Sequence, residues 1–255
     1  MRIGICEWSA KAGGEDLFKR MQRAGLSGVQ VSYETEGFSE KMERYLAWSA
    51  AYAITLTSVG ANVFCERALF DYSEDELVRV ITDISRSAAK TEGKLFHIPA
   101  FGASHIHNED ELQATAKALQ IACDTAAEYG VAVGAENALS LAENEWLMKA
   151  VDRPNLKLYF DTQNPETAPC HDATEQAAAF VGIIPEVHVK DCDETGRSVP
   201  LGTGTTRFAA TLKALVEGGY DGWLLLENGY GDENPEDEMK KDAARLNALL
   251  CGEMA

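Results

Sequence analysis

Hydrophobic and polar positions follow two different rhythms along this chain. Eight short runs are rich in β-branched and other apolar residues, and longer amphipathic segments rich in Ala, Leu, Glu and Lys separate them. The short runs predict strands at 2–8, 28–33, 54–60, 94–100, 131–137, 156–161, 186–191 and 223–228. The longer segments predict helices at 14–24, 39–52, 74–91, 109–129, 141–151, 172–182, 206–218 and 234–251.

This alternation indicates one barrel. Ser73 with Glu76 three residues on is a capping box, and Gly130 and Gly218 are typical of helix C-termini. Eight strands alternating with eight helices in 255 residues is the pattern of a (β/α)8 TIM barrel. An open doubly wound sheet is the alternative, but the chain after Trp8 lacks its G-x-G-x-x-G turn. No linker-like tract divides the sequence, so we expect residues 1–255 to form a single α/β domain.

Charge and composition narrow the classes of partner. The formal net charge of −18 repels phosphate backbones and acidic membranes, so we expect neither nucleic acid nor membrane as a partner. The N-terminus turns polar by Glu7 without the apolar core of a secretory signal, which makes a cytoplasmic location the expectation. Small-molecule chemistry is favoured by elimination, and a homo-oligomer is compatible with the sequence. The cysteines contain no C-x-x-C pair and are expected to be reduced thiols: Cys6, Cys65, Cys123, Cys170, Cys192 and Cys251.

Strong metal-ligand types stand near the ends of four successive predicted strands, where a barrel carries its functional groups. Glu136 ends the fifth run, Asp161 the sixth and Glu227 the eighth, and His188 lies in the seventh. Strand alternation allows all four side chains to point inward. Taken singly, such carboxylates are often helix caps or turn residues, and a lone His in a strand is more often a core residue. Together they would repel one another and lose solvation unless protons or a cation neutralised them, which favours a bound divalent metal.

The chemistry of the candidate ligands limits which metal ions would fit the site. Three oxygens and one nitrogen without a thiolate suit a fairly hard octahedral ion, so we expect Mn²⁺, with Mg²⁺, Co²⁺ and Zn²⁺ as alternatives. A closed structural zinc site is disfavoured because such sites prefer Cys and His ligands. The expected site would keep positions open for substrate oxygens or water.

Several motifs carry a resemblance to a known family: GAEN (134–137), YFDTQN (159–164), VHVKD (187–191) and the segment 201–228 that ends in WLLLEN. They resemble the xylose isomerase-like TIM barrel superfamily, in particular its sugar phosphate isomerase/epimerase branch with tagatose and psicose 3-epimerases and hydroxypyruvate isomerase. The resemblance implies that Glu136, Asp161, His188 and Glu227 hold the metal and that Glu136 and Glu227 are the catalytic proton-transfer pair. Many sugar epimerases of this family have His where this chain has Asn164, which can bind a hydroxyl group but cannot act as a base.

The resemblance also implies an activity. It is a metal-dependent sugar isomerase or epimerase that acts on a polyhydroxylated carbonyl compound through a metal-stabilised enediolate. Proton return to the opposite face gives epimerisation, and return to the adjacent carbon gives aldose–ketose isomerisation. The alternatives are a metal-dependent dehydratase of a β-hydroxy carbonyl compound and a non-catalytic sugar-binding or partner subunit. A multi-zinc endonuclease shares the fold, but the charge of −18 argues against it.

Other residues near the expected mouth are candidates for substrate binding. Lys190 shares the face of His188 and would polarise a substrate oxygen or pair with a carboxylate. Arg197 follows the seventh strand, where it would bind an anion or remain solvated. The full set of substrate-binding candidates is Lys190, Arg197, Asn164, His97, Glu7 and Trp8.

Three aromatic residues and two histidines near the expected mouth are further candidates for a role in the site. Trp8, Phe64 and Phe101 would form an apolar wall for a sugar ring, or else pack beneath the loops. His105 and His107 have an alternate spacing that suits metal ligands, but we expect them to be exposed loop residues.

Overall fold

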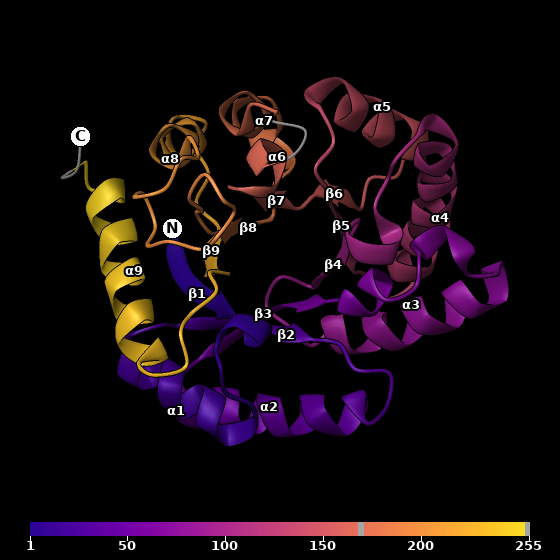
Figure 1. Ribbon diagram of the computed structural model, residues 1–255. Coiled ribbons are helices and arrows are strands. Elements are labelled where there is room, and N and C mark those ends of the chain that lie inside the picture. Colours follow the sequence, from indigo (N-terminus) through magenta and orange to yellow (C-terminus); the bar gives the residue numbers. More distant parts are fainter. Residues whose placement is uncertain (168–170, 253–255) are drawn as a thin grey trace.

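A ring of parallel strands with helices around it forms the fold (Figure 1). The computed structural model describes residues 1–167 and 171–252. The strands are β1 (Arg2–Cys6), β2 (Gly28–Ser32), β3 (Thr55–Gly60), β4 (Leu95–Pro99), β5 (Ala132–Glu136), β6 (Leu156–Leu158), β7 (Phe160–Asp161), β8 (Glu186–Val189) and β9 (Trp223–Leu226). Their order is β6-β5-β4-β3-β2-β1-β9-β8-β7. Because β6 and β7 are two pieces of one strand interrupted at Tyr159, the ring is a (β/α)8 TIM barrel, which confirms the predicted fold.

The helices lie outside the ring. They are α1 (Gly14–Ala24), α2 (Phe38–Tyr52), α3 (Glu74–Ala88), α4 (Glu109–Ala127), α5 (Leu141–Val151), α6 (Asn164–Thr167), α7 (Ala173–Phe180), α8 (Phe208–Glu217) and α9 (Pro235–Leu250). Each predicted helix is present within a few residues of its predicted bounds. The four-residue α6 was not predicted, because so short a helix leaves no periodic pattern. The first strand was predicted to reach residue 8, but it ends at Cys6 and gives way to a 3₁₀ turn at Glu7–Ser9.

Local sequence signals explain where helices begin. At the start of α3, the Ser73 side chain accepts a hydrogen bond from the backbone of Glu76, and the Glu76 side chain accepts one from the backbone of Ser73. The same reciprocal pair forms between Ser140 and Glu143 at α5. Both capping boxes satisfy backbone N–H groups that a helix leaves free.

Strand alternation divides the interior into two parts. Val187 and Val189 belong to the large apolar core between the strands and the helices, and His188 between them faces the barrel interior. Inside the barrel, Trp223 and Leu225 form a small apolar cluster with Cys6. Gly28 makes room for it, because a Cβ there would lie 2.5 Å from the Trp223 ring. Buried polar side chains such as Gln30 and Glu186 share the interior with this apolar cluster.

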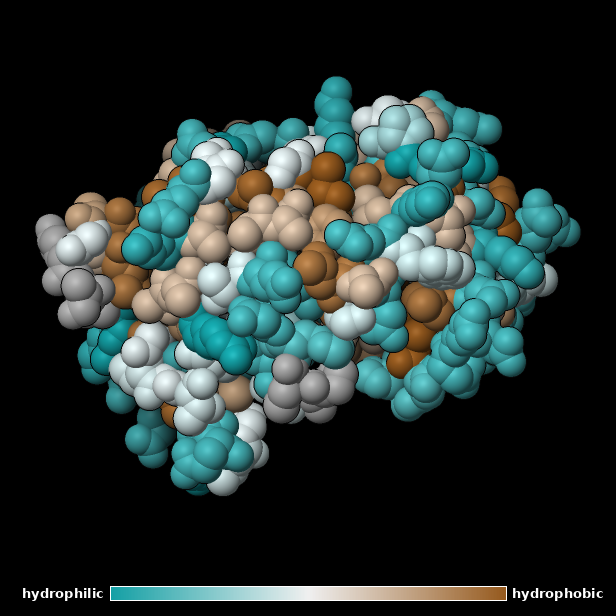
Figure 2. All heavy atoms as spheres, turned by 90° about the horizontal axis from the view of Figure 1, so that it is seen from above, coloured by the Kyte–Doolittle hydropathy of each residue, from teal (hydrophilic) through white to brown (hydrophobic). Residues whose placement is uncertain are grey.

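Few large hydrophobic side chains are exposed: among the described residues they are Val78, Trp146 and Val216. Figure 2 shows one side of the barrel, where hydrophilic side chains surround smaller apolar areas. Among the described residues, no helix is long and apolar enough to cross a membrane. Five cysteines are free thiols, as predicted, and Cys170 lies outside the described residues.

Candidate active site

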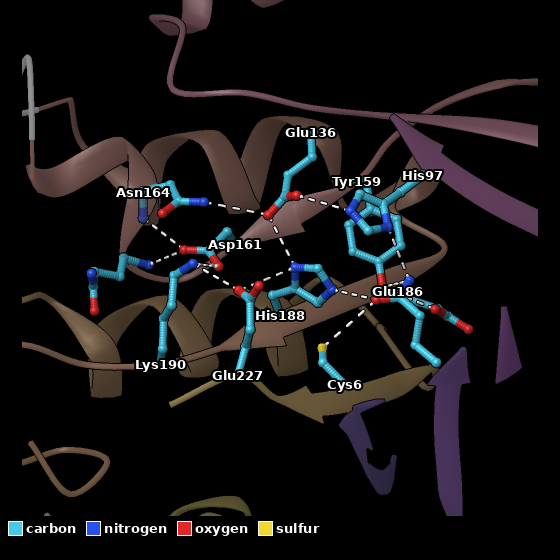
Figure 3. A network of polar contacts seen from close by, with 12 residues as sticks. Cys6, His97, Glu136, Tyr159, Asp161, Asn164, Glu186, His188, Lys190 and Glu227 are labelled. Atoms are coloured by element: carbon cyan, nitrogen blue, oxygen red, sulfur yellow. Dashed lines mark hydrogen bonds and ion pairs between the residues drawn. The ribbon is translucent and has the colours of Figure 1, made fainter. Parts of the chain in front are cut away.

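Four ionisable side chains meet at the carboxyl ends of the strands (Figure 3). Glu136 ends β5, Asp161 ends β7, His188 lies in β8 and Glu227 directly follows β9. Each offers one ligand atom, and these four atoms lie within 4.8 Å of one another. Parallel pairing of β7 with β8 sets Asp161 beside His188. The structure thus brings together the four residues that the sequence suggested as metal ligands, here named the carboxylate–histidine cluster.

His188 stands at the centre of the cluster and is fully buried. Its Nδ1 lies 3.0 Å from Glu136 Oε1 and 3.3 Å from Glu227 Oε2. Its Nε2 lies 2.7 Å from the side-chain oxygen of Gln30. His97 approaches from β4, with its Nε2 3.3 Å from Glu136 Oε2. One ring nitrogen of His188 therefore faces the two glutamates and the other faces the barrel interior.

Asp161 keeps one oxygen free of hydrogen bonds. Its Oδ1 accepts the backbone N–H groups of Gln163 at 2.7 Å and Asn164 at 2.6 Å. Its Oδ2 is buried and accepts no hydrogen bond, although Lys190 Nζ lies 3.1 Å away in an ion pair. The same ammonium lies 2.7 Å from Glu227 Oε2. A buried carboxylate oxygen without a hydrogen bond is costly unless a cation faces it.

The negative charges of the cluster are balanced only in part by Lys190 and His188. Burial raises the pKa of Asp161 to about 6, against the opposing charge of Lys190. Burial also disfavours the imidazolium of His188, but the surrounding Cys6, Glu227 and Glu136 raise its pKa well above the ordinary value. Likewise, Asp161 and Glu227 outweigh burial and raise the pKa of Lys190. An arrangement that holds protons this firmly attracts cations in general.

These residues fit a divalent cation. Three carboxylates and an imidazole nitrogen form a donor set for such an ion, and Asp161 Oδ2 has a lone pair available. One neighbour was not expected: Cys6 Sγ forms a second group of close ligand atoms with His188 and Glu227. Burial raises the pKa of the Cys6 thiol to about 12, which keeps the thiol protonated. Cys6 could bind a metal only if the metal displaced this proton.

Four of the six candidates for substrate binding lie at the cluster: Lys190, His97, Asn164 and Trp8. Asn164 Nδ2 donates to Glu136 Oε1 at 3.3 Å. Trp8 Nε1 donates to Glu227 Oε1 at 2.8 Å, and its ring lies 5.8 Å from the His188 ring. Trp8 therefore walls the cluster on one side and holds one of its glutamates.

Glu7 and Arg197 do not reach the cluster. Glu7 accepts hydrogen bonds from the Tyr45 hydroxyl at 2.5 Å and the Ser32 backbone at 2.8 Å, and pairs with Lys41 at 3.0 Å. Both of its oxygens thus fasten the first turn to β2 and α2. Arg197 has a side chain that is 79% exposed and pairs with Asp193 within its own turn. Local partners hold both side chains, and neither forms a hydrogen bond or ion pair with the cluster, so their contact with the substrate stays a prediction.

Phe64, Phe101, His105 and His107 lie in different surroundings. Phe64 is buried and packs its ring against Tyr72, so it belongs to the core and not to a wall at the mouth. Phe101 is half-buried in the loop after β4. His107 is exposed and His105 is half-buried, with their rings 4.5 Å apart, as expected for a surface loop.

Sequence reasoning missed the buried polar residues below the cluster. Gln30, Ser58 and Glu186 are at most 2% exposed inside the barrel, and Tyr159 joins them there. Burial raises the pKa of Glu186 to about 6. A signal existed for Gln30, because it stands between two valines in GVQVSY, as His188 does in EVHVKD.

Comparisons with known proteins agree with this fold. The family described as "Xylose isomerase-like TIM barrel" matches residues 18–249. The 2-epi-5-epi-valiolone 7-phosphate 2-epimerase of Actinoplanes sp. is 26% identical over 248 residues, covering 91% of this chain and 88% of that protein. The structure of L-ribulose 3-epimerase superposes with a TM-score of 0.82 at 19% identity, over 98% of this chain and 95% of that one. A crystal structure of the IOLI protein with a bound zinc atom gives 0.78 at 15% identity, over 100% of both chains.

Proposed function

The chain belongs to the xylose isomerase-like TIM barrel family, and on this premise we propose that it is a divalent-metal-dependent isomerase or epimerase of a polyhydroxylated carbonyl compound. The observation that carries the proposal is the convergence of four ligand atoms within 4.8 Å at the carboxyl ends of the strands. The relative from Actinoplanes sp. is named as an epimerase of a phosphorylated compound, which supports the reaction class.

We propose that Glu136, Asp161, His188 and Glu227 hold the ion. Mn²⁺ is the ion we propose, with Mg²⁺, Co²⁺ and Zn²⁺ as alternatives, and the zinc atom named for the IOLI structure supports a divalent ion in this fold. When bound, the ion supplies a Lewis acid that stabilises the negative charge of an enediolate.

Glu136 and Glu227 are proposed to move the proton. Their other partners differ, although His188 lies beside both: Asn164 and His97 contact Glu136, whereas Trp8 and Lys190 contact Glu227. Different surroundings let one carboxylate act as the base while the other delivers a proton. Proton removal from the carbon beside a carbonyl and return to its other face is epimerisation, and return to the adjacent carbon is isomerisation.

Lys190 and Trp8 are proposed to orient the substrate. The ammonium of Lys190 lies beside Asp161 and Glu227, where it can donate to a substrate oxygen. The ring of Trp8 offers an apolar face beside the cluster, and such a face suits the C–H side of a sugar and excludes water from the reacting carbon.

The test is conversion of a panel of ketoses, aldoses and their phosphates by metal-loaded protein, followed by NMR. We expect an isomer or epimer to form with the loaded wild type and to be absent after chelation. Glu136→Gln should slow conversion by about 10²-fold or more, and the exposed Glu175→Gln should leave it unchanged. Loss of water with a new conjugated absorbance would indicate a lyase and overturn the proposal.

A further inference from the structure

A column of buried polar side chains runs through the barrel below the carboxylate–histidine cluster. Gln30, from the middle of β2, is 0% exposed and joins the cluster to the deeper groups through its hydrogen bonds. Its side-chain oxygen lies 2.7 Å from His188 Nε2. Its side-chain nitrogen lies 2.8 Å from both the Ser58 and the Tyr159 hydroxyl oxygens.

The deepest carboxylate fixes the direction of the hydrogen bonds in this column. Glu186 Oε2 accepts from the Ser58 hydroxyl at 2.5 Å and from the Tyr159 hydroxyl at 3.0 Å. Each hydroxyl has a single hydrogen. Both hydroxyls have used it on Glu186, so toward Gln30 they can only accept. The amide nitrogen of Gln30 must therefore face them, and its oxygen must face His188.

This orientation determines which ring nitrogen of His188 carries hydrogen. The Gln30 oxygen has no hydrogen to give, so His188 Nε2 must donate to it. The lone pair of the neutral ring is then left on Nδ1, the nitrogen that lies 3.0 Å from Glu136 and 3.3 Å from Glu227. The amide nitrogen of Gln30 also lies 3.2 Å from His97 Nδ1, but both of its hydrogens are directed to the two hydroxyls. His97 Nε2 lies 3.3 Å from the Glu136 carboxylate, to which it can donate.

We propose that Gln30 is a positioning residue that presents His188 Nδ1, and not Nε2, to the bound metal. A metal-ligating histidine usually donates its other ring N–H to an oxygen, which fixes both its tautomer and its orientation. Here that oxygen belongs to an uncharged amide whose own orientation is set from Glu186. The presence of a metal in this inference rests on the proposed function. The direction of the hydrogen bond from His188 to Gln30 does not depend on it.

The first test reads the ring nitrogens of His188 by ¹⁵N NMR in histidine-labelled protein, without metal and with Zn²⁺. We expect Nε2 to carry a proton in both states and Nδ1 to be the nitrogen without a proton when zinc is present. An unprotonated Nε2 in either state would overturn the inference. A wild type that binds no divalent ion would refute the proposed function alone, because Nε2 is still read in the metal-free protein.

The second test compares Zn²⁺ affinity by competition with a chelator. Gln30→Met keeps the volume but removes the acceptor for His188, and loss of such an outer partner typically weakens metal binding about 10- to 100-fold. The matched control is Gln176→Met, because Gln176 is also buried, with its amide donating to Leu139 and accepting from Asn144, and contacts no cluster residue. Should Gln30→Met not fold, Gln30→Asn withdraws the amide by one methylene and serves in its place. Affinities within twofold of wild type in the folded Gln30 variant would overturn the inference.

Discussion

Replacing Lys190 by Met should destabilise the protein in a way that a divalent metal repairs. The ammonium of Lys190 lies 2.7 Å from Glu227 and 3.1 Å from Asp161, and its side chain is only 17% exposed. Removing one partner of a buried ion pair costs about 3–5 kcal/mol, because the remaining charge is left buried without compensation. A bound divalent cation faces the same two carboxylates, so it should compensate the charge that Lys190 no longer supplies.

The magnitude can be read from thermal unfolding. One kcal/mol shifts Tm by about 2–4 °C in a domain of this size, so Lys190→Met should lower Tm by roughly 6–20 °C without metal. Lys41→Met is the matched control, since Lys41 is 5% exposed and lies 2.6 Å from Glu34 and 3.0 Å from Glu7, away from the cluster. It should lose comparable stability.

Circular dichroism melts with and without saturating Mn²⁺ then separate the two lysines. We expect the rise in Tm on adding Mn²⁺ to be larger in Lys190→Met than in wild type, and to be the same in Lys41→Met as in wild type. An equal rise in all three proteins would refute the assignment of Asp161 and Glu227 as metal ligands beside Lys190.

Three further results are expected. Glu136→Gln and Glu227→Gln should each lower kcat by about 10²- to 10⁴-fold in steady-state assays while the fold is retained, because a side-chain amide cannot transfer the proton. An unchanged kcat would exclude a proton-transfer role for that glutamate. Trp8→Phe keeps the aromatic wall but removes the donor 2.8 Å from Glu227, a hydrogen bond to a charged group worth about 1.5–3 kcal/mol, so kcat should fall about 10- to 100-fold and KM change less. Mn²⁺ affinity should rise with pH, by up to about tenfold per pH unit, because the ion must displace a proton from His188. The pKa of His188 is raised by Cys6, Glu227 and Glu136 against the effect of burial. Calorimetry in two buffers would show the released proton, and an affinity that does not change with pH would contradict this.

The barrel and its cluster were predictable from the sequence for a physical reason. In a parallel barrel covered by helices, alternate strand residues face either an apolar layer or the interior. A polar residue between two valines, such as His188, therefore points inward at a height that its place in the strand sets. The same rule places Asp161 beside it, as the pairing of β7 with β8 confirms.

The partners of each side chain were not predictable in the same way. Glu7 and Trp8 follow one another, yet Glu7 turns outward to Lys41 and Trp8 turns inward to Glu227, because the chain enters a 3₁₀ turn there. Gln30 was detectable as an inward polar residue. Its contact with His188, 158 positions away, depends on the stagger of strands across the barrel, which no local pattern encodes.

The most direct measurement of the proposed chemistry is proton exchange with solvent. Metal-loaded protein would be incubated in D₂O with the carbonyl compound that it converts, and the substrate and product would be read by NMR. The proposed mechanism predicts deuterium at the carbon beside the carbonyl in the product, and loss of this exchange in Glu136→Gln or after chelation. Product formed without deuterium at that carbon, or exchange that persists without metal, would contradict it.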